Sequence, residues 1–262
     1  MINLWTPPVM KIYDALNGLM RLVGGCVRDF LLGQRPCDID ISTPLVPDRV
    51  KYMLEQSNIK VCPVSPRHGV MKATVAGEHF EITTLRQDAY NMGKEVISFI
   101  TDYAMDARRR DFTINALSMD KNTVYDYFGG ERDLKNKCIR FIGNPIVRLK
   151  EDALRILRYL RFWSIYGKNE PDADIVALFP MFRNNLAEVS YGRRKKELDK
   201  ILMSPRVIKV LNLMEESGLL SCVTVDGNVS RLRSFLNDNP MASLQDRLLY
   251  FGHYLKTERN KI

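Results

Sequence analysis

The stretch Leu22–Ser42, which reads LVGGCVRDFLLGQRPCDIDIS, constrains the fold of this chain more than any other. A short apolar run ends at the glycine pair Gly24-Gly25, and this pattern predicts a strand that turns sharply into a helix. A second strand pattern then carries Asp38 and Asp40. Because side chains i and i+2 of a strand share one face, the two carboxylates would point the same way. Adjacent carboxylates repel each other unless a cation lies between them, so the segment predicts a metal site.

The chemistry of the acidic pair and the glycine turn favours one class of reaction. Carboxylate oxygens suit Mg2+, which also accepts phosphate oxygens from a substrate. A glycine pair at a strand-to-helix turn offers backbone N–H groups to an anion. Taken singly, an Asp-x-Asp motif is usually solvated surface, and a glycine pair is usually an ordinary turn. Their combination within about 20 residues favours nucleotidyl transfer.

The composition is that of a globular protein with a polyanionic partner. The chain has 262 residues, of which 45% are hydrophobic, and its net charge of +8 favours nucleic acid or an anionic membrane surface. No run of about 18 apolar residues occurs, so we expect no membrane span, and the N-terminus shows no secretory signal. The cysteines are odd in number and lack a Cys-x-x-Cys pair, which predicts reduced thiols, no zinc site and a cytoplasmic protein.

Hydrophobic periodicity predicts an α+β part, with a small mixed sheet and helices, followed by an all-α part that begins near residue 143. Helices are expected over 9–20, 27–33 and 47–57, and strands over 21–25, 38–42, 70–75, 79–85 and 124–127. Residues 86–108 are polar and are expected to form a loop with one short strand at 95–99. A further helix is expected to begin within residues 111–116.

The element Arg108–Ala116, RRRDFTINA, concentrates three cations, a carboxylate and an amide. A triphosphate needs compact positive charge, and a ribose needs side chains that donate and accept hydrogen bonds. On a helix, Asp111 and Asn115 would lie at i and i+4, where they could meet a sugar while an arginine meets phosphate. A solvated basic helix start is the commoner fate of such a run. The apolar Phe112 and Ile114 indicate that the element is anchored, which favours nucleotide binding.

Residues 151–160, EDALRILRYL, show the pattern of an amphipathic helix. Its expected buried stripe consists of Ala153, Ile156, Leu157 and Leu160. Asp152, Arg155 and Tyr159 would lie on the other side, with Glu151 and Arg158 beside them. An Asp–Arg pair at this spacing is usually a salt bridge worth about 0.2–0.5 kcal/mol. The same pair can also read the Watson–Crick edge of a base, and the helix pattern leaves both interpretations open.

These segments together resemble the class II tRNA nucleotidyltransferase and poly(A) polymerase family, template-independent enzymes that add CCA or A tails to RNA 3′ ends. The resemblance covers most of residues 20–220, in family order and at family spacing. The matching stretches are LVGGCVRDFLLG with DIDIST, FEITTLR, RRRDFTINAL, YDYFGGERDLKNKCIRFIG, EDALRILRYLRF and SYGRRKKELDKILMSPRVIKVLNLMEESGLL.

The resemblance implies a role for each matching residue. The implied catalytic acids are Asp38, Asp40 and Glu81, of which Asp38 and Asp40 would bind Mg2+. The implied phosphate-binding residues are Gly24, Gly25 and Arg28, and the nucleotide- and ribose-binding residues are Arg110, Asp111 and Asn115. The residues implied to read or support the incoming base are Glu151, Asp152, Arg155 and Arg158. Arg193 and Arg194 would contact nucleotide or RNA phosphate.

The resemblance also implies the domains and the partners. We expect a nucleotidyltransferase head (palm) domain over 1–142, a helical neck that recognises the base over 143–202, and a helical RNA-binding body over 203–262. The expected partners are the tRNA 3′ end, CTP and ATP, and the sequence gives no oligomeric state. Family members usually continue through further helices that hold the tRNA, so we expect the body to be a shortened one.

One departure from the family sequence leaves related activities of the same family, here called siblings, open beside CCA addition. Family members that add CCA often show a sequence like D-G-R-H after the segment that matches FEITTLR, where this chain has Asn91-Met92-Gly93-Lys94. The siblings are a poly(A) polymerase and an enzyme limited to CC or A addition. An interpretation of another class is a catalytically silent RNA-binding module, and the intact acids and Arg110 speak against it.

Overall fold

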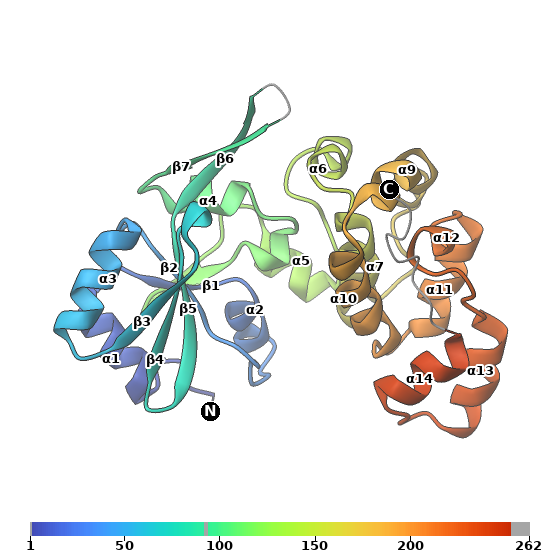
Figure 1. The fold of residues 1–262 in the computed structure, drawn as a ribbon, viewed down its shortest axis with the longest axis horizontal. Coiled ribbons are helices and arrows are strands. Elements are labelled where there is room, and N and C mark those ends of the chain that lie inside the picture. The colour runs from blue at the N-terminus through green and yellow to red at the C-terminus, as the bar shows by residue number, and fades with distance from the viewer. Residues whose placement is uncertain (1, 92–93, 253–262) are drawn as a thin grey trace, which may run out of the picture. The chain divides into compact units, whose positions relative to one another are not determined.

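The computed structural model describes residues 2–91 and 94–252 (Figure 1). The chain divides into two compact units, Met1–Lys135 and Asn136–Ile262. The first unit carries the sheets, and the second is helical. The prediction of an α+β part followed by an all-α part is therefore confirmed. None of the described helices is both long enough and apolar enough to cross a membrane.

The first unit is built on a mixed sheet with strand order β3-β4-β5-β2-β1-β8-β9. Its strands are β1 (Arg21–Val23), β2 (Asp40–Thr43), β3 (Lys60–Ser65), β4 (Val70–Val75), β5 (Glu78–Thr84), β8 (Ser118–Met119) and β9 (Val124–Tyr125). Strands β2 and β5 pair in parallel, and all other neighbours pair antiparallel. The predicted hairpin of β4 and β5 is confirmed, with Ala76 and Gly77 at positive φ in its turn.

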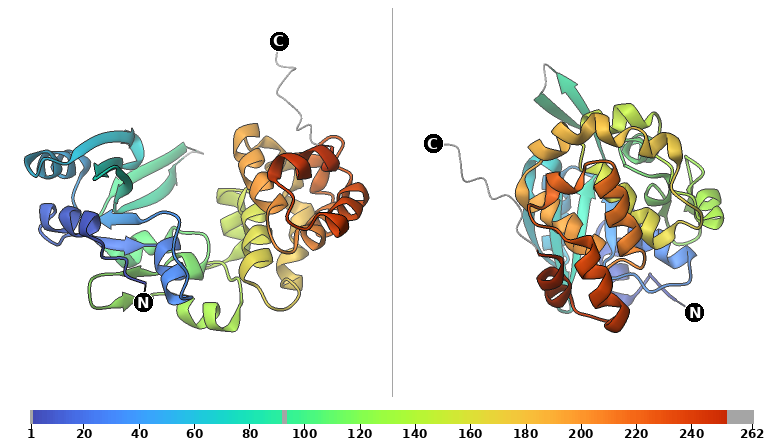
Figure 2. Two further views of the ribbon diagram at one scale, coloured as in Figure 1. Left: turned by 90° about the horizontal axis from the view of Figure 1, so that it is seen from below. Right: turned by 90° about the vertical axis from the view of Figure 1, so that its right-hand side faces the viewer.

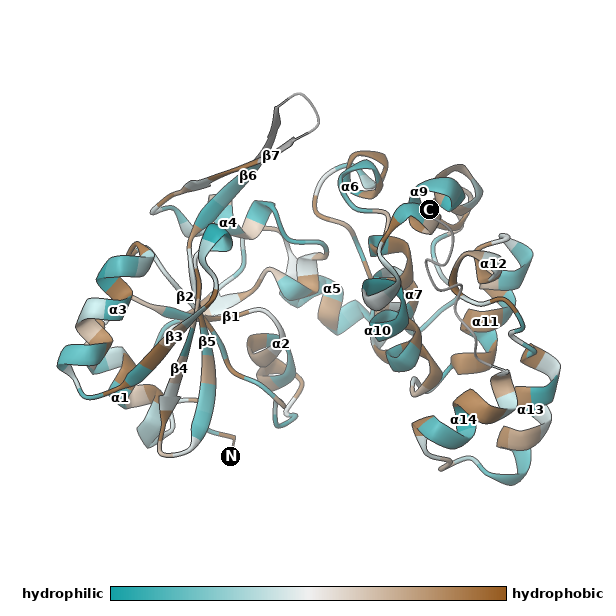
Figure 3. Ribbon diagram, viewed as in Figure 1, coloured by the Kyte–Doolittle hydropathy of each residue, from teal (hydrophilic) through white to brown (hydrophobic). Residues whose placement is uncertain are grey.

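Two helices cover one face of this sheet, as the views in Figures 1 and 2 agree. They are α1 (Pro7–Ala15) and α3 (Pro47–Gln56), each of which has proline in its first turn. Val9 and Ile12 of α1 and Leu54 of α3 are fully buried in the same core as Ile82 of β5. Along α3 hydrophobic and hydrophilic residues alternate (Figure 3), as expected for a helix with one buried side. The opposite face of the sheet carries Asp40 and Glu81 and is available for a site.

Several boundaries in the first unit differ from the prediction. Helix α1 ends at Ala15 instead of residue 20 because the chain turns at Gly18, which has a positive φ. Helix α2 (Gly25–Leu31) begins directly at the glycine pair. Strand β2 begins at Asp40, so the expectation that Asp38 belongs to the same strand was wrong.

Residues 86–108 differ most from the prediction, which expected a loop with one short strand. They form a hairpin of β6 (Arg86–Asn91) and β7 (Lys94–Phe99), followed by helix α4 (Tyr103–Arg108). Residues 92–93, part of the departure from the family sequence, lie outside the described residues. Hydrophobicity did not indicate the start of β6, because Arg86 and Asp88 form an ion pair there, at 2.9 Å.

The segment after α4 is also not the predicted helix. Only Thr113–Asn115 forms a single 3-10 turn, η2. Phe112 and Ile114 are both fully buried, which an extended entry into a short turn allows. The prediction that this element is anchored is confirmed, and its predicted helical geometry was wrong. Helix α5 (Gly130–Asn136) then leads to the division between the units.

The second unit is a set of helices packed against one another. They are α6 (Pro145–Glu151), α7 (Arg155–Tyr166), α8 (Ala173–Val176), α9 (Arg183–Glu188), α10 (Tyr191–Leu202), α11 (Val207–Glu216), α12 (Leu220–Val223), α13 (Val229–Asp238) and α14 (Leu244–Phe251). Helix α7 packs against α10, and a 2.7 Å ion pair between Arg161 and Glu197 joins the two helices.

The single helix predicted over 151–160 is interrupted. Asp152 has an extended backbone, with φ −156° and ψ 103°, so α6 ends at Glu151 and α7 starts at Arg155. The predicted buried stripe is confirmed. The expectation that Tyr159 faces outward was wrong, because its side chain is 1% exposed and its hydroxyl accepts the N–H of Asp172 at 3.0 Å. A buried tyrosine needs such a partner for its polar end.

Candidate active site

Three acidic side chains gather where β2 and β5 run in parallel. Asp40 and Glu81 are register partners on these two strands, and Asp38 lies two residues before Asp40. All three line one hollow of about 450 Å3. The sequence prediction that Asp38 and Asp40 share a site therefore agrees with their placement, although only Asp40 belongs to the strand.

The electrostatics of these acids favour a bound cation. Crowding by protein removes part of the hydration of Asp40 and raises its pKa; Arg110 opposes this shift and Asp38 adds to it. Burial likewise raises the pKa of Glu81, and the charge of Asp40 adds to the shift. The charge of Asp38 therefore disfavours the ionised form of Asp40, and the charges of Asp40 and Asp38 disfavour that of Glu81, which a divalent cation would reverse.

The arrangement of the acidic side chains limits the number of protein ligands that such a cation would have. Within residues 2–91 and 94–252, no three His, Cys, Asp or Glu side chains converge closely enough to hold one metal ion. A cation held by one or two carboxylates fits this arrangement, with water and substrate phosphate completing its shell, as Mg2+ prefers. The donor set therefore fits a metal that is shared with a phosphorylated substrate.

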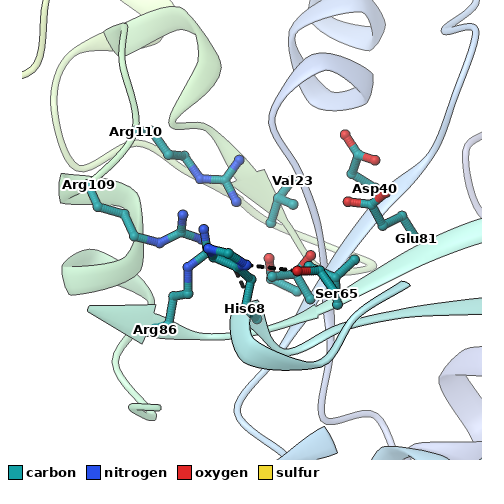
Figure 4. A pocket seen from close by; sticks show the side chains of 11 residues that line it. Val23, Asp40, Ser65, His68, Glu81, Arg86, Arg109 and Arg110 are labelled. Atoms are coloured by element: carbon teal, nitrogen blue, oxygen red, sulfur yellow. Dashed lines mark hydrogen bonds between the residues drawn. The ribbon is translucent and has the colours of Figure 1, made fainter. Parts of the chain in front are cut away.

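A wall of arginines faces the acids across a second hollow of about 350 Å3. Figure 4 shows Arg86, Arg109 and Arg110 on one side and Asp40 and Glu81 on the other. Arg86 opens β6, whereas Arg109 and Arg110 directly follow α4. A hollow with carboxylates on one side and guanidinium groups on the other can hold a polyphosphate whose metal-bound end lies at the acids.

The buried carboxylate of Asp106 holds this wall together. Asp106 is 2% exposed and accepts hydrogen bonds from the backbone N–H of Arg86 at 3.2 Å, from Arg109 at 2.7 and 2.9 Å, and from Arg110 at 3.3 Å. Burial alone would raise the pKa of Asp106, but Arg110 and Arg109 hold it below its ordinary value. Asp106 was not predicted as a site residue, although its spacing of three and four from the two arginines was an available signal in the sequence.

The residues expected to bind phosphate and ribose form one hydrogen-bonded cluster. Arg28 donates to the side chain of Asn115 at 2.6 Å, and Asn115 donates to Asp111 at 3.1 Å. All three are 8% exposed. The backbone carbonyl of Asn115 also accepts from Arg110 at 3.5 Å, which links the cluster to the arginine wall.

The glycine pair lies close to the side chains of two arginines of the site. Gly24 has φ +73°, and a Cβ atom there would lie 3.0 Å from the Arg110 guanidinium. The N–H of Gly24 donates to the Leu117 carbonyl at 2.8 Å, so it is used within the fold. A Cβ at Gly25 would lie 3.6 Å from Arg28. Gly24 therefore leaves room for Arg110 beside the backbone, whereas a Cβ at Gly25 would make only an ordinary contact with Arg28; the N–H of Gly24 is not the anion donor that the sequence suggested.

The second unit places the residues expected to read the base in two ion pairs. Arg155 lies 2.5 Å from Glu151, and Arg148 lies 2.8 Å from the same carboxylate oxygen. Partial burial would raise the pKa of Glu151, but hydrogen bonds from Arg155 and Arg148 hold it below its ordinary value. Asp152 pairs with Arg193 at 2.6 Å. The two candidate base readers thus have separate partners, unlike the direct Asp152–Arg155 pair that helical spacing suggests.

The remaining candidates differ in accessibility. Arg158 pairs with Glu197 at 3.5 Å and keeps 30% of its side chain exposed. Arg193 keeps 54% of its side chain exposed, so phosphate can reach it. Arg194 is 8% exposed and donates to the Cys222 carbonyl at 2.5 Å, so its placement favours holding α10 to α12 over contact with RNA.

Models of two protein families match the sequence. "Poly A polymerase head domain" matches residues 20–140, and "Probable RNA and SrmB- binding site of polymerase A" matches residues 170–223. Among curated proteins, the mitochondrial CCA tRNA nucleotidyltransferase 1 of Danio rerio is 38% identical, with 85% of this chain and 53% of the relative covered. The CCA-adding enzyme of Oceanobacillus iheyensis is 41% identical, with 72% and 47% covered. The chain spans about half the length of these relatives.

Solved structures resemble both the fold and the sequence. The Bacillus stearothermophilus CCA-adding enzyme in complex with CTP aligns with TM-score 0.72 and 25% identity, over 95% of this chain and 67% of that one. A tRNA nucleotidyltransferase with a primer tRNA and an incoming ATP analog aligns with TM-score 0.70 and 27% identity, over 92% and 73%. The sequence motifs, the sheet with its acids and the family models agree. The chain belongs to the class II tRNA nucleotidyltransferase and poly(A) polymerase family.

Proposed function

We propose that this chain carries the catalytic part of an enzyme that transfers nucleotides from CTP and ATP to the 3′ end of tRNA. The names of the relatives support this activity, because they are CCA-adding enzymes and CCA tRNA nucleotidyltransferases. One observation carries the proposal: Asp40 and Glu81 stand in register on parallel strands and face three arginines across one hollow. A triphosphate needs both features, a metal-binding end and a cationic end.

In this proposal Asp38 and Asp40 are the residues that hold the divalent metal, which we propose to be Mg2+, and Glu81 is the third catalytic acid beside them. When bound, the metal activates the RNA 3′-hydroxyl and offsets the charge of the pyrophosphate leaving group. Arg110 and Arg109 orient the triphosphate and stabilise its negative charge. Positioning dominates the catalysis, because the protein supplies no covalent intermediate.

The cluster of Arg28, Asp111 and Asn115 is proposed to recognise the ribose and the phosphates. Asn115 both accepts and donates in this cluster, as contact with a sugar hydroxyl requires. Nucleotide binding would exchange some of these internal hydrogen bonds for bonds to the sugar. Arg110 then connects the cluster to the arginine wall through the Asn115 carbonyl.

In the second unit we propose that Asp152 and Arg155 read the base of the incoming nucleotide. Glu151 holds Arg155, and Arg158 lies one helical turn further along α7. We propose residues 143–202 as the base-recognising neck and 203–262 as part of an RNA-binding body. Arg193, at the exposed start of α10, is the proposed RNA or nucleotide phosphate contact. The described cysteines carry no disulfide, which agrees with the proposed cytoplasmic location, although the zebrafish relative is named mitochondrial.

Incubation with tRNA that lacks its 3′ end tests this function. CTP and ATP are supplied singly and together, and product length is measured on a sequencing gel. CCA addition gives two added residues with CTP alone and three with both nucleotides. A ladder of A residues identifies the poly(A) sibling, and an arrest after CC or a requirement for preformed CC identifies the partial activities. No extension under any condition, by folded protein with Mg2+, contradicts the proposal.

A further inference from the structure

A lysine continues the row of acidic side chains across the sheet, and neither the sequence motifs nor the proposed mechanism gives it a role. Asp40 of β2 is the register partner of Glu81 on β5, and Glu81 is in turn the register partner of Lys72 on β4. Residues directly opposite each other on neighbouring strands share one face of the sheet. Lys72 therefore leaves the sheet on the same face as the two acids, and it lines the hollow of about 450 Å3 that contains them.

The ordinary interpretation of a lysine beside Glu81 is an ion pair across two strands. Within residues 2–91 and 94–252, however, no ion pair joins Lys72 to Glu81, and no other carboxylate holds its ammonium group. Strand β4 pairs with β3 on one side and with β5 on the other, so the backbone of Lys72 is fixed. Its four-carbon side chain can still move the charge within the hollow, which leaves the ammonium available to a ligand.

The order of the strands indicates which substrate reaches this lysine. Strand β1 lies on the other side of β2 and leads into Gly24, where a Cβ would lie 3.0 Å from the Arg110 guanidinium. Arg110, which we propose to orient the triphosphate, therefore lies on the β1 side of Asp40, whereas Lys72 lies on the β4 side of Glu81. In nucleotidyl transfer the attacking hydroxyl and the leaving pyrophosphate are roughly in line through the α-phosphorus. The RNA 3′ end therefore approaches from the side of Lys72.

The lining of the hollow suits the last nucleotide of an RNA chain. Val64 of the edge strand β3 lines it and is 55% exposed, which offers an apolar surface to a ribose. Opposite residues such as Glu81 and Lys72 have Cβ atoms about 4.5–5.5 Å apart. One ribose likewise separates the 3′-hydroxyl of a nucleotide from its own 5′ phosphate. A hydroxyl beside the acids and a phosphate beside the lysine can therefore be bound together.

We propose that Lys72 binds the last phosphodiester of the acceptor RNA and so places the terminal 3′-hydroxyl beside Asp40 and Glu81, with Val64 against the terminal ribose. This inference rests on the proposed nucleotidyl transfer and assigns the seat of the RNA end to it. Lys72 is a positioning residue for the acceptor and not for the nucleoside triphosphate. A phosphate contact carries no sequence information, so the same seat serves the RNA end after each addition.

Steady-state addition of CMP to an acceptor-stem RNA hairpin tests this role. Lys72→Met keeps most of the side chain and removes its charge. KM for the RNA should rise about fivefold to tenfold, a modest loss for a charge-assisted contact because the hollow is open to water. KM for CTP should change less than about twofold, and Lys72→Arg should recover most of the loss. The matched control, Lys51→Met, removes a half-exposed lysine of α3, on the opposite face of the sheet, and should change neither constant.

An RNA with a neutral methylphosphonate at its last linkage tests the contact itself. With wild-type protein, this RNA should show the same rise in KM as the Lys72→Met variant shows with ordinary RNA. Combining the two changes should add less than about a further twofold, because both remove one shared contact. A methylphosphonate several linkages further back should leave the effect of Lys72→Met undiminished.

Three results would overturn the proposal. An unchanged KM for RNA in folded Lys72→Met would remove the contact. Equal rises in KM for RNA and for CTP would show that Lys72 acts through the acids. Losses from the variant and from the methylphosphonate that multiply in full would show that Lys72 does not bind this phosphate. Equilibrium binding of the two RNAs, followed by fluorescence anisotropy, separates the inference from the proposed function: if Lys72 and the last phosphate are coupled in binding but no tRNA is extended, the proposed function fails and this inference stands.

Discussion

Replacing Asp106 by asparagine should loosen the arginine wall of the hollow and destabilise the first unit. The carboxylate is 2% exposed and accepts from three different residues. Asparagine keeps the size of the side chain but removes its charge. Arg109 and Arg110 would then lose the counter-charge that orients them toward the hollow.

The size of the effect follows from the burial of the partners. Removing one member of a fully buried ion pair costs about 3–5 kcal/mol. The side chains of Arg109 and Arg110 keep 18% and 21% exposure, so water can partly replace Asp106. Arg109 also retains Asp88 at 3.6 Å. We therefore expect a loss near the lower end of that range, about 3 kcal/mol.

Urea unfolding followed by tryptophan fluorescence measures this loss. The two tryptophans report separately, because Trp5 lies in the first unit and Trp163 in the second. A Trp163→Phe background therefore isolates the first unit. The matched control is Asp14→Asn, an exposed aspartate in the same unit, which should change stability by less than about 0.5 kcal/mol.

The pH dependence gives a second check on the same residue. Asp106 has a lowered pKa when folded, so its stabilisation is complete at neutral pH and disappears as pH falls below the ordinary aspartate range. The stability difference between wild type and Asp106→Asn should shrink in that acid window. A loss as small as that of the control at neutral pH, or a difference that is constant with pH, would refute the reasoning.

Three further predictions follow from the site. Gly24→Ala should cost about 1–3 kcal/mol of unfolding free energy and raise KM for CTP, because its Cβ would crowd Arg110; Gly77→Ala, with φ +83° and open space, controls for backbone strain alone, and equal losses would contradict the crowding. Arg155→Ala should change discrimination among CTP, ATP, UTP and GTP by about 1–3 kcal/mol in single-nucleotide kinetics, whereas an unchanged preference order would leave only the salt bridge with Glu151. Binding of an acceptor-stem hairpin should weaken with salt, with a log–log slope of about −0.7 per single-strand phosphate contact, and salt-independent binding would remove the electrostatic argument from the +8 charge.

The sequence predicted those helices and strands whose pattern lies within one short segment. Helix α3 has proline at its start and an apolar side, and β4–β5 alternates around a glycine turn. The acidic pair was found because spacing within one segment places Asp38 beside Asp40. Glu81 came from the family resemblance, and its register with Asp40 depends on the parallel pairing of β2 with β5.

Features that depend on residues far away in the sequence were not predicted. The hairpin is formed by backbone pairing of β6 with β7, and the ion pair of Arg86 with Asp88 lies within β6, so hydrophobic periodicity does not reveal β6. Asp152 leaves the helix and forms an ion pair with Arg193 of α10, 41 residues away. Tyr159 is buried because its hydroxyl finds the N–H of Asp172, a partner that no helical pattern contains. Lys72 enters the site only through the pairing of β4 with β5, which places it beside Glu81.

The central claim is that the acids facing the arginine wall perform nucleotidyl transfer, and label transfer from α-labelled CTP tests it most directly. The measurement follows labelled tRNA from a substrate that lacks its 3′ end, over a titration of Mg2+ and after chelation. We predict metal-dependent labelling by wild type, and a loss on the order of 10^3-fold or more in Asp40→Asn. The variant should be at least as stable as wild type without metal, because the raised pKa of Asp40 shows that its charge opposes folding as pH rises through that value. Near-normal labelling by the folded variant, or labelling that persists after chelation, would contradict the account.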